Sequence, residues 1–110
     1  MPGISKPNGG GDKVPTPELQ KLRLEIDQLD QDLIAVLAKR FAVVDRVIVE
    51  KQRHGIAATL QDRVEQVAAN ARRLAETTNV PPDTAERIWR LLIAETIRYE
   101  EAVLRPKNGG

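Results

Sequence analysis

The chain has 110 residues, the length of one domain, and its 17 basic and 16 acidic residues leave a formal net charge of +1. So balanced a charge gives no reason to expect nucleic-acid binding, and no run of about 18 apolar residues offers a membrane span. With no cysteine and one histidine, the chain lacks the residues for a disulfide framework, thiolate chemistry or a zinc site. The start of the chain has no apolar signal core, so we expect a cytoplasmic protein.

Residues 1–16 are rich in Gly and Pro, which predicts a disordered N-terminal tail. A long helix follows, from Pro17 to His54, because Thr16 can cap it, Pro17 suits its first position and neither Gly nor Pro recurs inside. At 1.5 Å per residue this helix measures roughly 54 Å, whereas a domain of ~100 residues has a radius of gyration of only ~13 Å. Such a rod overhangs the rest of one chain, and we expect a second copy of the chain to cover it.

Apolar residues recur along this helix at the 3-4 spacing of a heptad seam, and Arg40 interrupts that seam. Lys51 lies eleven residues later, rotated by only ~20° on 3.6-residue geometry, so the two cations share one predicted buried face with Val44. Because a buried cation needs a partner, Arg40 makes either an internal salt bridge or part of an anion pocket. Lys51 is close enough to the helix end to snorkel. The seam consists of Leu19, Leu22, Ile26, Leu29, Leu33, Val36, Val43 and Val47.

A second helix is predicted from Leu60 to Thr77, after the glycine that follows His54 has ended the first. Thr59 and Asp62 resemble a capping box. Arg63 lies in the first turn, where a cation opposes the helix dipole, so it either faces an anion or is a solvated surface residue. The stripe is rich in alanine, which implies close packing against a neighbouring helix; it consists of Val64, Val67, Ala68, Ala71, Leu74 and Ala75.

A third helix is predicted from Pro82 to Leu104, with residues 106–110 as a C-terminal tail. Two polar residues, Thr96 and Glu100, lie one turn apart on or beside its apolar face. Thr96 is either part of the site or a core residue that bonds its own backbone, and Glu100 is either part of the site or solvated. The stripe consists of Ala85, Ile88, Trp89, Leu92, Thr96, Tyr99 and Val103.

The polar residues predicted on the buried faces form a mainly cationic set, with no usual nucleophile and no histidine base. Such a set suits a small dianion. It favours a reaction driven by positioning and charge stabilisation over one with covalent steps. The set consists of Arg40, Lys51, Arg63, Thr96 and Glu100.

The order and spacing of these residues resemble the all-helical class of chorismate mutases. The likeness runs from Leu22-Arg23-x-x-Ile26-Asp27-x-x-Asp30 through Arg40, Lys51 and Arg63 to Thr96-x-x-x-Glu100, within a helical domain over residues 17–105. It implies an all-α fold of three-helix chains that form an intertwined homodimer with shared active sites. The implied reaction is the Claisen rearrangement of chorismate to prephenate in the shikimate pathway, without cofactor or metal, for aromatic amino acid biosynthesis or secondary metabolism.

The resemblance also implies roles for individual residues. Arg23 reaches a substrate carboxylate from the partner subunit, which agrees with its separation of 17 residues, or ~25 Å, from Arg40 along one helix. Arg40 holds the other carboxylate, and Arg63 adds to the cationic wall. Lys51 donates to the ether oxygen as its bond breaks, and Thr96 stands where the family usually has a serine near a carboxylate.

Three positions depart from the family pattern. Val64 and Leu60 replace two acidic residues that usually address the C4 hydroxyl, and Glu100 replaces a glutamine beside the ether oxygen. We expect Glu100 to be either protonated or neutralised by Lys51. Mutases of 4-amino-4-deoxychorismate are similar in having Arg-Val on the second helix and Arg-x-Glu on the third. Two alternatives stay open: an isochorismate-pyruvate lyase on the same fold, and a non-catalytic helical dimer that serves as a binding module.

Overall fold

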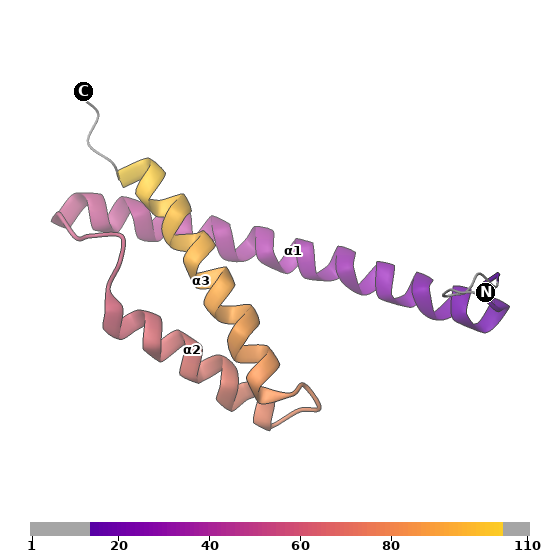
Figure 1. Cartoon of the computed structure of the whole chain (residues 1–110). Coiled ribbons are helices and arrows are strands. Elements are labelled where there is room, and N and C mark those ends of the chain that lie inside the picture. The colour runs from indigo at the N-terminus through magenta and orange to yellow at the C-terminus, as the bar shows by residue number, and fades with distance from the viewer. Residues whose placement is uncertain (1–13, 105–110) are drawn as a thin grey trace, which may run out of the picture. The chain divides into compact units, whose positions relative to one another are not determined.

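The computed structural model describes residues 14–104, and within that range it contains three α-helices and no strand. They are α1 (Pro17–His54), α2 (Gln61–Glu76) and α3 (Pro82–Leu104), as Figure 1 shows. The predicted all-α class with three helices is confirmed, and the bounds agree with prediction to within one residue. The predicted tails, apart from residues 14–16, lie outside the described residues.

The two ends of α1 have the caps that the sequence predicts. At the start, Leu19 N–H donates to Thr16 Oγ1 at 3.0 Å. At the end, Gly55 has a φ of +64°, a left-handed conformation that glycine adopts without steric cost. Two backbone hydrogen bonds complete a Schellman motif: Ile56 N–H donates to the Lys51 carbonyl at 2.9 Å, and Gly55 N–H donates to the Gln52 carbonyl at 3.5 Å.

The start of α2 differs from the predicted capping box. Leu60, not Thr59, is the N-cap residue, and no side chain caps the helix. Leu60 has an extended backbone (φ −120°, ψ 103°), and its carbonyl accepts from the N–H groups of Arg63 and Val64 at 2.9 and 3.1 Å. Thr59 therefore lies one residue too early to reach the free N–H groups of the first turn. The free N–H groups of this turn remain available to an anion.

The chain divides into two units, residues 1–38 and residues 39–110, with the boundary inside α1. In the first unit the predicted seam is exposed to solvent. Ile26 is 56% exposed and Leu29 59% exposed, in a helix whose apolar residues should be buried. The predicted single domain over residues 17–105 stays a prediction.

In the second unit, α2 and α3 pack against each other through small side chains. The alanine side of the α2 stripe forms the contact, as predicted, but Leu74 is 64% exposed and Ile88 is 53% exposed. Tyr99 and Val103 of the predicted stripes are also exposed in the single chain, and the buried Ile93 was missed, because periodicity identifies a stripe but not its centre. The buried apolar residues of this unit are Val44, Ile48, Ala68, Ala71, Ala75, Ala85 and Ile93.

Ion pairs on the surface also join α2 to α3. Arg90 forms two hydrogen bonds with Glu65, at 2.9 and 3.2 Å, and a third with Glu86. Arg72 bonds Asp83 at 2.6 Å and Glu86 at 3.2 Å. The hydrogen bonds and charge of Arg90 lower the pKa of Glu65. Exposed pairs contribute little one by one, but this network fixes how the two helices face each other.

The C-terminal part of α1 meets α3 through longer side chains. The rings of Phe41 and Tyr99 pack edge to face, with centroids 5.0 Å apart and an interplanar angle of 69°. The Tyr99 hydroxyl donates to Asp45 Oδ1 at 2.5 Å. These contacts hold the part of α1 that carries Arg40 and Lys51 against the part of α3 that carries Thr96 and Glu100.

Candidate active site

A cavity of about 210 Å³ lies between the end of α1, the start of α2 and the second half of α3. Its lining contains three cationic side chains and one carboxylate, together with a threonine and a set of aliphatic side chains. Seven of the eight site residues predicted from the sequence line it. The full lining is Arg40, Val44, Val47, Lys51, Ala58, Leu60, Arg63, Val64, Val67, Ile93, Thr96, Ile97 and Glu100.

Arg40 extends from α1 toward α3 and is half-buried. Its Nη1 donates to Thr96 Oγ1 at 3.0 Å. No carboxylate within residues 14–104 forms a salt bridge with Arg40, so the internal salt bridge considered for it is not made. The guanidinium charge faces the cavity without an anionic neighbour, which is the arrangement expected of an anion pocket.

Lys51, unlike Arg40, has a carboxylate partner. Its Nζ lies 2.7 Å from Glu100 Oε1 and donates to the Ala58 carbonyl at 2.9 Å. The two charged side chains are only 13% and 8% exposed, so the pair is nearly buried. Lys51 therefore does not extend to solvent, and the alternative that Glu100 is a solvated surface residue is wrong. Of the two states expected for Glu100, the geometry favours the one neutralised by Lys51.

The remaining predicted residues form the rim and one wall. Arg63 is exposed at the cavity and its Nη1 donates to Gln66 Oε1 at 2.5 Å, so it is tethered within its own helix. Leu60 and Val64 present an aliphatic wall with no hydrogen-bonding side chain. Arg23 belongs to the first unit, where it is exposed, and it is not among the residues that line the cavity.

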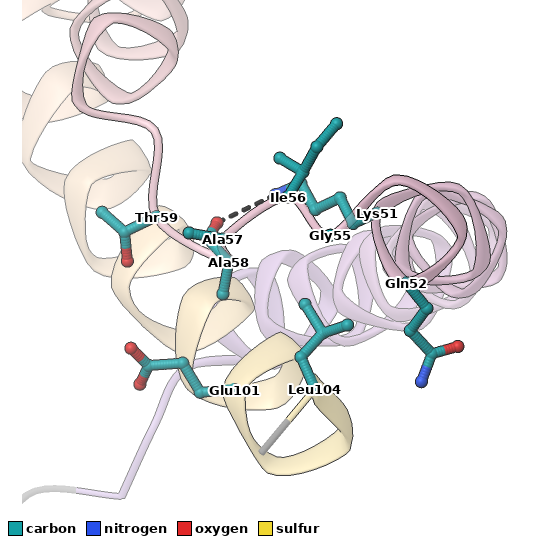
Figure 2. A pocket seen from close by; sticks show the side chains of 9 residues that line it. All are labelled: Lys51, Gln52, Gly55, Ile56, Ala57, Ala58, Thr59, Glu101 and Leu104. Atoms are coloured by element: carbon teal, nitrogen blue, oxygen red, sulfur yellow. Dashed lines mark hydrogen bonds between the residues drawn. The ribbon is translucent and has the colours of Figure 1, made fainter. Parts of the chain in front are cut away.

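Sequence reasoning missed one polar group of the site, the main-chain carbonyl of Ala58. It belongs to the segment between α1 and α2, and Figure 2 shows it accepting the hydrogen bond from Lys51. A backbone acceptor leaves no trace in residue types. The glycine turn that ends α1 was the only available signal, because it determines where the following residues lead.

A larger open groove of about 720 Å³ lies beside the cavity and shares Lys51 and Ala58 with it (Figure 2). Its other lining residues are Gln52 of α1, the segment after α1 and the end of α3, where Glu101 is the one further charge. Lys51 is its only cation, and Glu100 already neutralises that cation. The groove therefore has little to offer a dianion, and we assign the candidate site to the smaller cavity.

The charges of the cavity set its chemistry. Three cations, Arg40, Lys51 and Arg63, against one carboxylate, Glu100, leave a formal charge of +2. No cysteine or histidine lines the cavity, and its one hydroxyl belongs to Thr96. Among the described residues, no cluster of side chains suits a metal ion. The cavity can bind a small dianion and stabilise charge that develops on an oxygen.

None of the helices in the described part of the chain is long and apolar enough to cross a membrane. The cytoplasmic location stays a prediction.

Comparisons with known proteins add to this geometry. The chain is 36% identical over 83 residues to the T-protein of Enterobacter agglomerans, a match that covers 76% of this chain but only 22% of that protein. It is 31% identical over 87 residues to the 4-amino-4-deoxychorismate mutase of Streptomyces venezuelae, covering 79% of this chain and 84% of the relative. The protein of the same name from Streptomyces pristinaespiralis is 28% identical over 95 residues, with 86% and 74% covered.

No solved structure matches the chain significantly. The family model described as chorismate mutase type II matches residues 22–101, which include every residue of the cavity and Arg23. Because this match covers most of the chain, and because the cavity has the charge that the family's dicarboxylate chemistry needs, the chain belongs to the chorismate mutase type II family.

Proposed function

We propose that the chain is a mutase that catalyses the Claisen rearrangement of chorismate, or of its 4-amino-4-deoxy analogue, to prephenate or 4-amino-4-deoxyprephenate. The observation that carries the proposal is the Arg40 guanidinium, which forms no salt bridge among the described residues and lines the same cavity as the Lys51 ammonium. Both candidate substrates are dicarboxylates, and a cavity of formal charge +2 offsets their charge. Membership of the chorismate mutase type II family supports the same reaction.

The rearrangement needs no nucleophile. The ether C–O bond breaks as a new C–C bond forms within the same molecule, and negative charge develops on the ether oxygen in the transition state. An ammonium group has three protons. Glu100 and Ala58 occupy two of those on Lys51, which leaves one proton for the ether oxygen. Lys51 held in this way is preorganised to stabilise the developing charge, while Arg40 fixes one carboxylate of the substrate.

The wall formed by Leu60 and Val64 bears on the choice between the two substrates. Aliphatic side chains give the C4 hydroxyl of chorismate no hydrogen-bond partner, and a hydroxyl that loses its water without a partner binds less well. The similarity to two proteins named 4-amino-4-deoxychorismate mutase supports the amino substrate.

A homodimer with shared sites is the second part of the proposal. The exposed apolar seam of the first unit, including Ile26 and Leu29, supports it, because a second copy of the seam can cover these side chains. Arg23 lies on the same stretch of helix. In this arrangement Arg23 of one copy completes the cavity of the other and binds the second carboxylate, while Arg63 adds positive charge at the rim.

One assay tests the activity. The protein is incubated separately with chorismate, 4-amino-4-deoxychorismate and isochorismate, and the products are separated by chromatography. We expect a prephenate-type product from one or both of the first two substrates, and none with the Arg40→Ala variant. Pyruvate released from isochorismate would instead establish the lyase alternative. No reaction with any of the three would favour the non-catalytic binding module.

Subunit mixing tests the shared site separately. We expect the Arg23→Ala and Arg40→Ala variants each to be inactive alone, and the two are mixed with each other after mild denaturation and refolding. In a dimer with shared sites, one cavity of every mixed pair has both arginines intact, so random pairing restores about a quarter of the parent activity. No recovery, with both variants folded and dimeric, would show that each cavity uses only its own chain.

A further inference from the structure

The hydroxyl of Thr96 has one proton, and that proton is already in use. Thr96 Oγ1 donates to the Leu92 carbonyl one turn earlier, at 2.8 Å, and accepts from Arg40 Nη1 at 3.0 Å. The residue is only 8% exposed, so water does not compete strongly for these bonds. A hydroxyl that donates to a backbone carbonyl has no proton left for a carboxylate, and its remaining lone pair repels one.

Thr96 is also held rigidly. A β-branched side chain in a helix has few allowed χ1 rotamers, and the bond to the Leu92 carbonyl selects one of them. The acceptor lone pair of Oγ1 therefore has a fixed direction. Arg40, in contrast, has a long side chain with many rotamers, and its bond to Thr96 is its one side-chain tether among the described residues.

The two cations of α1 are thus held in different ways. Glu100 holds Lys51 and neutralises it, whereas Thr96 holds Arg40 and leaves its charge intact. A guanidinium has five N–H donors, of which Thr96 occupies one. The others, with the full positive charge, remain for a ligand that binds in two-point fashion.

We infer that Thr96 is a positioning residue, which orients the Arg40 guanidinium toward a substrate carboxylate and does not itself bind the substrate. This inference rests on the proposed function and revises the expectation that Thr96 contacts a carboxylate. The α3 helix then contributes to catalysis through α1. Before the substrate binds, the Thr96 hydroxyl of α3 already fixes the direction of the Arg40 guanidinium of α1.

Two substitutions separate the hydroxyl from the shape of the side chain. Thr96→Val keeps the shape and removes the oxygen, and Thr96→Ser keeps the oxygen. We expect Thr96→Val to raise KM for chorismate or its 4-amino analogue by about 10-fold, the effect of losing one hydrogen bond to a charged group, with kcat changed less than KM. Thr96→Ser should stay within about threefold of the parent. The melting temperature of Thr96→Val should be unchanged or higher, which a merely structural role does not explain.

A double substitution shows whether Thr96 acts through Arg40. In an Arg40→Lys background, we expect Thr96→Val to change KM by less than about twofold, because the group that it positions is gone. The same 10-fold rise in both backgrounds would show that Thr96 contacts the substrate directly, and it would overturn the inference.

A measurement without substrate separates failure of this inference from failure of the proposed function. In ¹⁵N NMR spectra of the unliganded protein, restricted rotation of the Arg40 guanidinium should be seen in the parent and in Thr96→Ser, and lost in Thr96→Val. Equal mobility of the guanidinium in all three proteins would overturn the inference even if the enzyme is active. Absence of turnover alone would count only against the proposed function.

Discussion

The Lys51 ammonium and the Glu100 carboxylate lie 2.7 Å apart in a cavity whose other charged residues are both cations, and both groups are nearly buried. The pair has two effects of opposite sign. It holds Lys51 in place, and it subtracts one positive charge from a site that we propose binds a dianion. The balance between the two effects is open to experiment, because glutamine has nearly the same shape as glutamate without its charge.

Glu100→Gln should bind the substrate more tightly and be less stable than the parent. The amide oxygen still accepts from Lys51, but the formal charge of the cavity rises from +2 to +3. We expect KM to fall by up to about 10-fold at low salt, with the gain reduced at high salt by screening. The melting temperature should fall, since a nearly buried ammonium loses its counter-charge. Glu101→Gln, which alters an exposed neighbour, is the control. Unchanged KM and stability would show that the pair is not ionised.

Arg40→Ala should abolish substrate binding without destabilising the protein. The guanidinium has no anionic partner among the described residues, so its removal relieves an unbalanced charge in a half-buried place. We expect an equal or higher melting temperature and loss of the protection that chorismate gives the parent against thermal unfolding. Arg46→Ala, an exposed position on the same helix, should leave protection intact. A fall in the melting temperature of several degrees would indicate a structural role for Arg40.

The helix bounds were predictable because their signals are local. Thr16 and Pro17 start α1, Gly55 ends it and Pro82 starts α3, and each acts through its own backbone or side chain without help from the rest of the fold. Seven of the eight residues predicted for the site line one cavity, and their roles in binding and catalysis stay predictions. The polar residues were predictable from their helical spacing on apolar faces, whereas Leu60 and Val64 were named only because of the family resemblance.

The sequence left the pairing within the site open between alternatives. Arg40 and Lys51 are both long cations on one face of α1; Arg40 was open to an internal salt bridge or an anion pocket, and Lys51 to snorkelling or to neutralising Glu100. The choice of Glu100 for Lys51 and Thr96 for Arg40 depends on the register between α1 and α3. That register is set by contacts such as Tyr99 with Asp45, which join residues 54 positions apart. The prediction that Thr59 caps α2 was wrong because the helix begins one residue later than predicted.

Disrupting the seam should separate the subunits. Ile26→Glu combined with Leu29→Glu places charges on side chains that are more than half exposed in the single chain and that a second copy would bury. We expect light scattering to give about twice the 12.2 kDa mass of the chain for the parent and one mass for the variant, with loss of activity. Gln31→Glu, a charge on the same helix away from the seam, is the control. A parent that is monomeric at micromolar concentration would contradict the proposed dimer.

Val64→Glu should shift the substrate preference toward chorismate. A carboxylate in the aliphatic wall gives the C4 hydroxyl an acceptor that neither Leu60 nor Val64 provides. We expect the ratio of kcat/KM for chorismate to that for the 4-amino analogue to rise by 10-fold or more, within the range for pocket substitutions. Val64→Met, which stays apolar, should leave the ratio within about threefold. If Val64→Glu lowers both values equally, this wall does not face C4.

Tyr99 is the only tyrosine, so its ionisation can be followed directly by ultraviolet absorbance. Its hydrogen bond to Asp45 raises its pKa above 10.0, with smaller contributions from burial and from the Asp45 charge. Because the pKa in the folded state is raised, the stabilisation is fully present below pH 10 and is lost as the pH rises through the folded-state pKa.

In the Asp45→Asn variant, the titration midpoint of Tyr99 should move down toward the value for the urea-unfolded chain. The stability of this variant should depend less on pH on the alkaline side. A midpoint that does not change between the two proteins would show that the Tyr99–Asp45 hydrogen bond is not maintained in solution.

The left-handed turn at Gly55 has a consequence for anyone who wishes to redesign this enzyme. Three residues after the turn, the Ala58 carbonyl accepts a hydrogen bond from the Lys51 ammonium, which we place next to the breaking bond of the substrate. An insertion or deletion between Gly55 and Ala58 would move the Ala58 carbonyl oxygen away from Lys51, although it changes none of the charged side chains of the site. Libraries that vary this connection in sequence but keep its length are therefore the ones expected to yield working catalysts.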